Sequence, residues 1–379
     1  MKSLFALLFS LSALLVPFSA RAALPVPPPP QIDARSWLLI DAASGLPLAE
    51  KNADTKVEPA SLTKLMTAYI AFSALKEGRL KPDQTLPVSE KAWRAEGSRM
   101  FLDPKKPARV DDLLKGMIVQ SGNDACVVLA EAIAGSEESF AHLMNQMAKK
   151  LGMTGTYYMN STGLPHPQHL TTARDLARLS TALIRDFPNY YALYSIKDFT
   201  YNGITQPNRN RLLYLDPSVD GVKTGHTASA GYCLIASARR DQRRLLSVVL
   251  GAASDGARAM ESQKLLNYGF QFFETVKLYP ANQPVSRLRI YKGKGSEVKA
   301  GFPYDFHVTV PRGAAKSIQA QLITQQPLLA PVSRGQRLGT LRLSVEGKPV
   351  GDYPLLALED VAVSGLLGRG WDNLLLMFK

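Results

Sequence analysis

The spacing of apolar residues changes near residue 275, and this change constrains the fold more than any other feature. Four earlier segments repeat apolar residues with a helical period: 61–77, 111–134, 136–151 and 172–186. Apolar runs that stop at turn residues predict strands: 36–50, 231–238 and 245–252. Later runs alternate apolar and polar residues between Gly or Pro clusters. We therefore expect an α+β domain at 35–275 and a small all-β domain at 277–360.

The first 22 residues have the pattern of an export signal. Lys2 precedes an apolar run at 4–18, and Ala20-Arg21-Ala22 follows shortly after it. A charged start, a short apolar stretch and small residues at a cleavage point favour a signal peptide, with an uncleaved anchor as the alternative. We expect residues 1–22 to be removed and the Pro-rich segment 23–34 to be a stiff linker.

Whether the two cysteines, Cys126 and Cys233, form a disulfide depends in part on export. An oxidising compartment would allow them to pair. Both lie within apolar runs rather than loops, which favours two buried free thiols. Two cysteines and five histidines are too few for a disulfide framework or a zinc ribbon. We predict no metal site and no cofactor.

The C-terminal segment 363–379 is predicted to be an amphipathic helix that lies on a membrane surface. Large apolar residues recur along one helical stripe: Leu367, Trp371, Leu374, Leu375 and Phe378. Arg369 and Asn373 fall on the opposite side. The alternative is a helix that docks on its own domain.

The chain is basic, with a formal net charge of +13. This charge favours an anionic partner, and together with the amphipathic C-terminal segment it indicates an anionic membrane surface. The aromatic residues show no stacking motif, so we expect no binding to nucleic acid. Four arginines lie in 239–244, between two predicted strands, where we expect a solvated hairpin tip.

The first motif with chemical meaning is Ser61-Leu62-Thr63-Lys64. If Ser61 opens a helix, Lys64 lies on the same helix face. A serine hydroxyl becomes a nucleophile when a base removes its proton. Burial and a nearby cation would keep the Lys64 amine neutral, so that it can act as this base. Ser73 and Lys76 have the same spacing but lie inside an apolar helix, where core packing explains them.

Two further motifs supply polar groups. In Ser121-Gly122-Asn123 a hydroxyl can relay a proton and an amide can bind a carbonyl, although a turn and helix cap would explain this motif alone. Lys223-Thr224-Gly225, followed by His226, begins an apolar strand. The lysine provides a cation, the glycine permits close approach of a backbone, and a strand edge can pair with an extended peptide.

In this order, the three motifs resemble those of the low-molecular-mass penicillin-binding proteins, the serine D-alanyl-D-alanine carboxypeptidases of bacterial cell walls. Segments 160–165 and 172–175 are also similar to that family, and the resemblance covers nearly the whole chain after the export signal. It implies a β-lactamase/DD-peptidase-like fold, in which helices flank an antiparallel five-stranded sheet. It also implies peripheral attachment to the periplasmic face of the bacterial inner membrane.

The resemblance also implies roles for the motif residues. It implies five catalytic residues: Ser61, Lys64, Ser121, Asn123 and Lys223. It implies four substrate-binding residues: Thr224, Gly225, His226 and Arg258. Backbone N–H groups of Ser61 and His226 would form the oxyanion hole. The implied reaction removes the C-terminal D-alanine from peptidoglycan pentapeptides through an acyl-Ser61 intermediate, which β-lactams would trap.

Two related activities and a non-enzymatic role are the alternatives. A common class of serine β-lactamase hydrolyses its acyl-enzyme with a glutamate-activated water, and no glutamate occurs between Ser139 and Met260. A DD-endopeptidase would use the same residues on cross-linked peptides. A scaffold protein with an inactive site would not need the complete set of motif residues that this chain has.

Overall fold

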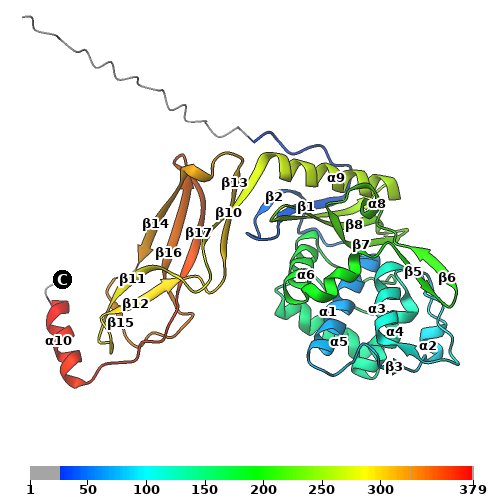
Figure 1. Ribbon diagram of the computed structural model, residues 1–379, viewed down its shortest axis with the longest axis horizontal. Helices are drawn as coiled ribbons and strands as arrows, with labels where there is room; N and C mark the ends of the chain where they lie inside the picture. The colour runs from blue at the N-terminus through cyan, green and yellow to red at the C-terminus, as the bar shows by residue number, and fades with distance from the viewer. Residues whose placement is uncertain (1–25, 325, 378–379) are drawn as a thin grey trace, which may run out of the picture.

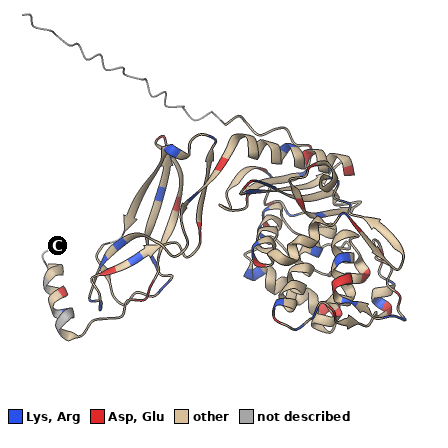
Figure 2. Cartoon of the chain, viewed as in Figure 1, with Lys and Arg blue, Asp and Glu red and all other residues tan. Residues whose placement is uncertain are grey.

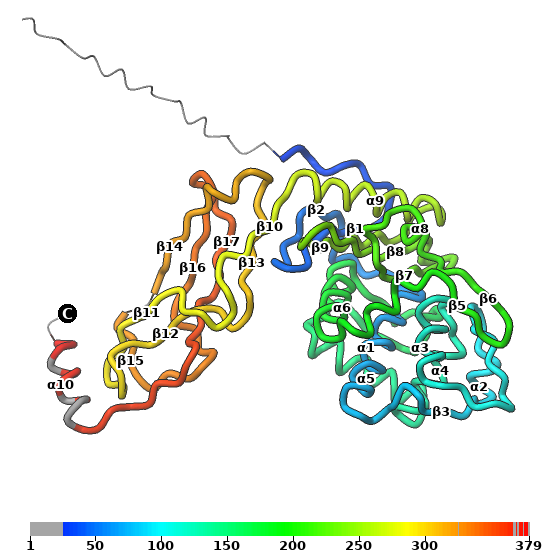
Figure 3. The backbone as a smooth tube through the Cα atoms, in the orientation of Figure 1, coloured from blue at the N-terminus to red at the C-terminus, as the bar shows by residue number. Residues whose placement is uncertain are grey.

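The computed structural model describes residues 26–324 and 326–377, so the expected export signal and the first residues of the linker lie outside the described residues. Two lobes are joined where helix α9 (Asp255–Phe272) runs into strand β10 (Phe273–Tyr279), as the continuous tube of Figure 3 shows. One lobe combines a sheet with helices, and the other is built from strands (Figure 1). The predicted α+β fold with a C-terminal all-β part is confirmed.

The sheet of the first lobe has five antiparallel strands in the order β2-β1-β9-β8-β7, as expected. Its strands are β1 (Ser36–Asp41), β2 (Pro47–Lys51), β7 (Val219–Thr227), β8 (Gly231–Arg240) and β9 (Arg243–Ala252). Strand β7 therefore forms one edge of the sheet. The third motif, residues 223–225, is part of this edge strand.

Helices cover both faces of this sheet (Figure 1). α9 lies on one face, and the other face carries α1 (Lys64–Lys76), α3 (Val110–Val119), α4 (Asn123–Ala134), α5 (Glu137–Lys150) and α6 (Ala173–Asp186). Successive side chains of β1 point to opposite faces of the sheet, so this strand contributes to the core on both sides. Leu38 and Ile40 join the core of the larger helical group, whereas Trp37 and Leu39 join the core beneath α9.

The remaining elements of this lobe are short. They are α2 (Glu90–Trp93), α7 (Pro188–Tyr191), α8 (Leu212–Leu215), the 3₁₀ turns η1 (Ala60–Thr63) and η2 (Ala192–Ser195), and strands β3 (Thr85–Leu86), β4 (Ala108–Arg109), β5 (Asp198–Tyr201) and β6 (Ile204–Pro207). The predicted helix at 61–77 begins as η1. The predicted segment 111–134 is two helices, because Ser121 takes a left-handed φ of 63° between them.

The prediction of a solvated tip at 239–244 is confirmed for Arg239, Asp241 and Gln242, which are exposed, and is wrong for Arg243 and Arg244, which form ion pairs. Arg243 is largely buried and pairs with the fully buried Asp41 at 2.9 Å. Arg244 pairs with Asp220 at 2.7 Å. Both acids come from other strands or loops, so local sequence could not reveal them. Charged residues of both signs are spread over the two lobes in Figure 2, with no single basic patch on the cartoon.

The second lobe is an all-β structure around its own core, which includes Leu288, Val308 and Leu343. Its strands are β11 (Pro284–Tyr291), β12 (Glu297–Gly301), β13 (Phe306–Pro311), β14 (Ile318–Thr324), β15 (Leu328–Leu329), β16 (Arg337–Val345) and β17 (Lys348–Ala357), with a 3₁₀ turn η3 (Ala315–Ser317). β10 pairs with β13, and the other strands form one sheet in the order β14-β16-β17-β12-β11-β15.

The described chain ends in helix α10 (Leu366–Met377), beside the all-β lobe (Figure 1). Trp371 exposes 64% of its surface, and Leu366 and Met377 are also strongly exposed. Asp372 accepts a hydrogen bond from the backbone N–H of Lys292, which ties the helix to the lobe. Within the described part of the chain, no helix has the length and apolar character needed to cross a bilayer.

Both cysteines are buried and free, as predicted. Cys126 lies on α4, and burial raises the pKa of its thiol to about 12. Cys233 lies on β8, and burial raises the pKa of its thiol as well. Neither thiol is therefore a reactive thiolate at neutral pH.

Candidate active site

The three motifs meet at one cleft of about 680 Å³. η1 brings Ser61, the break between α3 and α4 brings Ser121, and edge strand β7 brings the third motif. Residues predicted from the sequence that line the cleft are Ser61, Ser121, Thr224, Gly225, His226 and Arg258. The other predicted residues are Lys64, Asn123 and Lys223, which are buried directly behind this lining.

Lys64 is placed to act as a base toward Ser61. Its Nζ lies 3.0 Å from Ser61 Oγ. The side chain is almost fully buried, with 1% exposure, and burial lowers the pKa of its ammonium to about 8. An amine with this pKa is neutral in a useful fraction of molecules near neutral pH. The pair therefore meets the geometric and the electrostatic conditions for activating a serine.

The segment 160–164 holds η1, the turn that carries Ser61, and the start of α1 in place. The carbonyl oxygen of Thr162 accepts a hydrogen bond from Lys64 Nζ at 2.6 Å, and that of Ser161 accepts one from Thr67 Oγ1 at 2.6 Å. Both acceptors point at α1 from a segment about 95 residues later in the chain. Residues of this segment were recognised only by their likeness to the family, and no local pattern indicates that they position a lysine.

Lys223 forms a second buried pair with Ser121. Its Nζ donates to Ser121 Oγ at 3.0 Å. Burial, together with the charge of Lys64, lowers the pKa of Lys223 well below its ordinary value. The left-handed φ of Ser121 is a strained conformation for a residue with a Cβ, and such conformations cluster at functional sites.

Asn123 contributes an acceptor that no described residue satisfies. Its Nδ2 donates to the carbonyl oxygen of Glu96 at 2.5 Å, whereas its buried Oδ1 has no partner in the described chain. Buried polar atoms nearly always have a partner, so this oxygen is suited to a donor from a substrate or from a shifted lysine.

Gly225 lets β7 approach η1 closely. A Cβ on this residue would lie 3.0 Å from the carbonyl oxygen of Pro59 and 3.3 Å from Cβ of Ala60. The neighbouring Thr224 is buried at the cleft wall, and His226 is exposed with its ring 4.1 Å from that of Tyr232. The third motif therefore lies beside Ser61, as the family resemblance implied.

Arg258, predicted to bind substrate, also forms hydrogen bonds and an ion pair within the protein. Its Nη1 donates to the carbonyl oxygen of Gly225 at 3.1 Å, and its Nη2 pairs with Asp255. Asp255 also pairs with Arg211 at 2.6 Å. Arg209 lines the same cleft and forms no ion pair within the described residues, so its guanidinium is free for a ligand.

Several lining residues carry no recognisable pattern in the sequence. They are Gly97, Ser98, Asn208, Arg209, Arg211, Tyr232 and Asp255. Ser73, the serine with the same spacing as Ser61, lies apart from the cleft and donates weakly to Glu77 at 3.4 Å. In the described ranges, no group of three or more His, Cys, Asp or Glu side chains is arranged to hold a metal ion.

Comparison with known families identifies both parts of the chain. Residues 23–254 match the Peptidase S11 family, described as D-alanyl-D-alanine carboxypeptidase. Residues 273–363 match the C-terminal domain of penicillin-binding protein 5. The first match covers the lobe that holds the cleft up to the start of α9, and the second covers the all-β lobe.

Individual relatives agree with these matches. The chain is 47% identical over 357 residues to D-alanyl-D-alanine carboxypeptidase DacC of Escherichia coli, covering 92% of this chain and 89% of the relative. The crystal structure of penicillin-binding protein 5 from Haemophilus influenzae superposes with a TM-score of 0.84 at 41% identity, covering 88% and 99% of the two chains. Penicillin-binding protein D2 of Listeria monocytogenes, solved in an ampicillin-bound form, matches with a TM-score of 0.60 at 32% identity, covering 65% and 100%. The chain therefore belongs to the Peptidase S11 family of D-alanyl-D-alanine carboxypeptidases and carries the C-terminal domain of penicillin-binding protein 5.

Proposed function

We propose that this D-alanyl-D-alanine carboxypeptidase acts on peptidoglycan pentapeptides through acylation of Ser61. Lys64 Nζ takes the proton from Ser61 Oγ, and Oγ attacks the carbonyl carbon of the penultimate D-alanine. The C–N bond to the terminal D-alanine then breaks and leaves an ester on Ser61. The distance of 3.0 Å between this hydroxyl and a buried amine of lowered pKa is the observation that supports the proposal most.

The leaving D-alanine nitrogen needs a proton, and we assign its delivery to Ser121. The Ser121 hydroxyl faces the cleft and is hydrogen-bonded to Lys223, so a proton can pass to the hydroxyl as it gives up its own. The unpaired Oδ1 of Asn123 would accept a hydrogen bond from a backbone N–H of the bound peptide. Lys64 passes the proton taken from Ser61 to the Ser121–Lys223 pair, which replaces the proton given to D-alanine. Water then attacks the acyl-enzyme with the neutral Lys64 amine as the base.

The substrate's terminal carboxylate distinguishes a carboxypeptidase from other acyl-transfer enzymes. We assign its binding to Thr224 together with Arg258 and Arg209. Arg209 is the free guanidinium of the cleft, whereas Arg258 is held by Asp255 and supports the wall at Gly225. Backbone N–H groups of Ser61 and His226 would stabilise the oxyanion, because the close contact of β7 with η1 brings these residues together.

The scarcity of acidic side chains in the cleft supports carboxypeptidase activity over β-lactam hydrolysis. Asp255 is the one acidic residue that lines the cleft in the described part of the chain, and Arg211 and Arg258 both pair with it. A carboxylate held between two guanidiniums is a poor base. We therefore expect slow hydrolysis of a penicilloyl ester, so that β-lactams remain bound to Ser61.

We further infer where this enzyme acts. The proposed units are a cleaved signal at 1–22, a linker at 23–34, a catalytic domain at 35–275, an all-β domain at 277–360 and an anchor at 363–379. Trp371 and its exposed apolar neighbours on α10 suit burial in an anionic membrane interface. The all-β domain would then hold the cleft above the periplasmic face of the inner membrane.

Release of D-alanine tests the proposed reaction. A chain that begins at Ala23 is incubated with a soluble pentapeptide and, separately, with a cross-linked peptide dimer. We expect release from the pentapeptide, none with Ser61→Ala, and unchanged release with the control Ser73→Ala. Full activity of Ser61→Ala would overturn the mechanism, and faster cleavage of the dimer would favour the endopeptidase alternative.

A further inference from the structure

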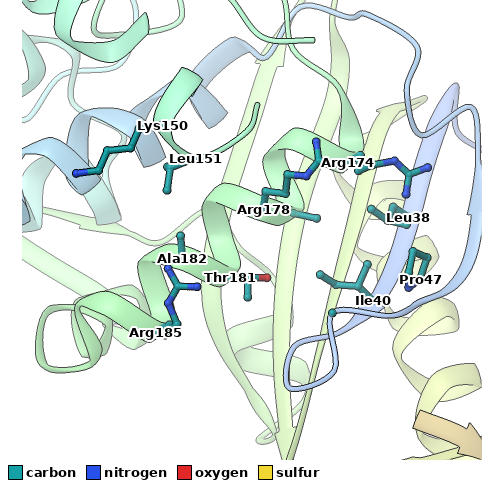
Figure 4. A pocket seen from close by; sticks show the side chains of 12 residues that line it. Leu38, Ile40, Pro47, Lys150, Leu151, Arg174, Arg178, Thr181, Ala182 and Arg185 are labelled. Carbon is teal, nitrogen blue, oxygen red and sulfur yellow. The ribbon is translucent and has the colours of Figure 1, made fainter. Parts of the chain in front are cut away.

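A second cavity of about 530 Å³ lies between α6, the β1–β2 pair and the C-terminal end of α5 (Figure 4). It shares no lining residue with the catalytic cleft. Its apolar wall is formed by Leu38, Ile40, Pro47, Leu151, Ala177 and Ala182. A cavity of this size and character can hold a small ligand or a short peptide segment.

The charged residues around this cavity are all cations. They are Lys150, Arg174, Arg178 and Arg185. In Figure 4 the three arginines lie around the apolar wall, and the Lys150 side chain extends away from it. No acidic side chain lines the cavity in the described chain. Arginine and lysine in such an arrangement complement a carboxylate.

Acidic partners outside the cavity hold these arginines without using all their donors. Arg178 binds Asp175 and the carbonyl of Gly152 through Nη1 alone, so its Nε and Nη2 stay available. Arg185 binds Asp186 through Nε and Nη2, which leaves Nη1. Lys150 forms no ion pair with any residue that the structure describes.

Thr181 provides a separate indication of a ligand. Its Oγ1 is shielded from solvent and has no hydrogen-bond partner among the described residues. In Figure 4 this oxygen points toward the Ile40 side of the cavity. A shielded hydroxyl without a partner is uncommon, and rotation of the Thr181 side chain, which lines the cavity, would bring this hydroxyl to an amide group of a bound peptide.

We propose that this cavity binds an anionic peptide with small aliphatic side chains, namely a neighbouring stem peptide of the peptidoglycan polymer. The peptide's carboxylate would pair with Lys150, Arg178 and Arg185, and its alanine methyl groups would contact the apolar wall. The proposal rests on the proposed function, because that function identifies the polymer as the substrate. The cavity performs no chemistry and keeps the polymer near the cleft between successive cleavages.

The test separates this cavity from the cleft by blocking Ser61 with benzylpenicillin. The blocked protein is titrated with an N-acetylated tetrapeptide that ends in D-alanine, and with the same peptide as its C-terminal amide, by calorimetry. We expect the acid to bind about tenfold more tightly than the amide. No binding of the acid to blocked protein, or equal binding of acid and amide, would overturn the proposal.

Matched variants assign the binding to the cavity. Lys150→Glu/Arg185→Glu is expected to weaken acid binding by more than about tenfold, and Thr181→Val by about fivefold. The control Lys149→Glu/Arg94→Glu changes the net charge equally at exposed positions outside the cavity and should bind normally. Equal weakening by the control would refute a specific site. D-alanine release from a soluble pentapeptide, measured on the same proteins without penicillin, reports separately on the proposed function.

Discussion

Gly163 lies so close to Ala60 that a Cβ on Gly163 would come within 1.8 Å of the Ala60 carbonyl oxygen. This contact joins two backbones that are about 100 residues apart in the sequence. Thr162, the residue before Gly163, accepts the hydrogen bond from Lys64. The contact therefore fixes the distance between η1, the turn that carries Ser61, and the carbonyl that accepts from Lys64.

Gly163→Ala is expected to disrupt this contact. The added methyl group must displace the turn that carries Ser61, so acylation by a fluorescent penicillin should slow by at least about tenfold. Gly152→Ala is the matched control, because Gly152 also has a positive φ but a Cβ there meets nothing within 4 Å. The control should lose only about 1 kcal/mol of stability and keep its acylation rate. Equal rates in both variants would contradict this account of the turn.

The pKa of Lys64 predicts how acylation depends on pH. Burial lowers that pKa to about 8, and only the neutral amine accepts a proton. The acylation rate should therefore rise about tenfold per pH unit below pH 8 and level off above it. Lys64→Arg cannot become neutral and should lose about a hundredfold to ten-thousandfold in rate. A rate that stays constant from about pH 6 to about pH 9 would show that Lys64 is not the base.

The sequence was sufficient to predict the core of the site for a physical reason. Ser61 and Lys64 are three residues apart, so any helical turn brings them together. The five-stranded sheet and the all-β lobe followed from a family resemblance and from strand alternation. Lys223 and Ser121 could be joined to this pair only through that resemblance, because their contact spans 102 residues.

Features created by long-range packing were not predictable. Arg243 was expected in a solvated tip, yet Asp41, from β1, pairs with it in the interior. Arg209 occurs in a polar stretch with no periodicity, and only the folded chain shows that it enters the cleft. The role of Thr162 depends on a backbone carbonyl, which every residue has, so no residue type could indicate it.

His169 is expected to position η1, the turn that carries Ser61. Its Nδ1 accepts from the N–H of Met159 at 3.3 Å, so its Nε2 carries the proton toward Thr63 Oγ1 at 2.9 Å. Burial lowers the pKa of His169 to about 4, which keeps the ring neutral. His169→Phe leaves both partners unpaired and should cost about 1–3 kcal/mol in urea unfolding, with slower acylation. His169→Gln retains an amide donor and should recover part of the lost stability and part of the lost acylation rate. If His169→Phe unfolds at the same urea concentration as the unchanged protein, His169 does not have this role.

Helix α10 is expected to attach the enzyme to membranes. A chain that begins at Ala23 should sediment with vesicles containing anionic phospholipid, because Trp371 and its neighbours insert at the interface. A chain ending at Val363 should stay in the supernatant and keep its D-alanine release. Trp371→Ala should weaken vesicle binding by about tenfold. Sedimentation of the shortened chain would place the attachment elsewhere.

Mass spectrometry after exposure to benzylpenicillin tests the central claim most directly. Digestion of the labelled protein should yield one penicilloyl adduct per chain, on the peptide that contains Ser61. Pretreatment with a pentapeptide in excess should delay its formation, because both compounds acylate the same hydroxyl. An adduct on Ser73 or Ser121 instead, or no adduct at all, would contradict the assignment of Ser61 as the nucleophile.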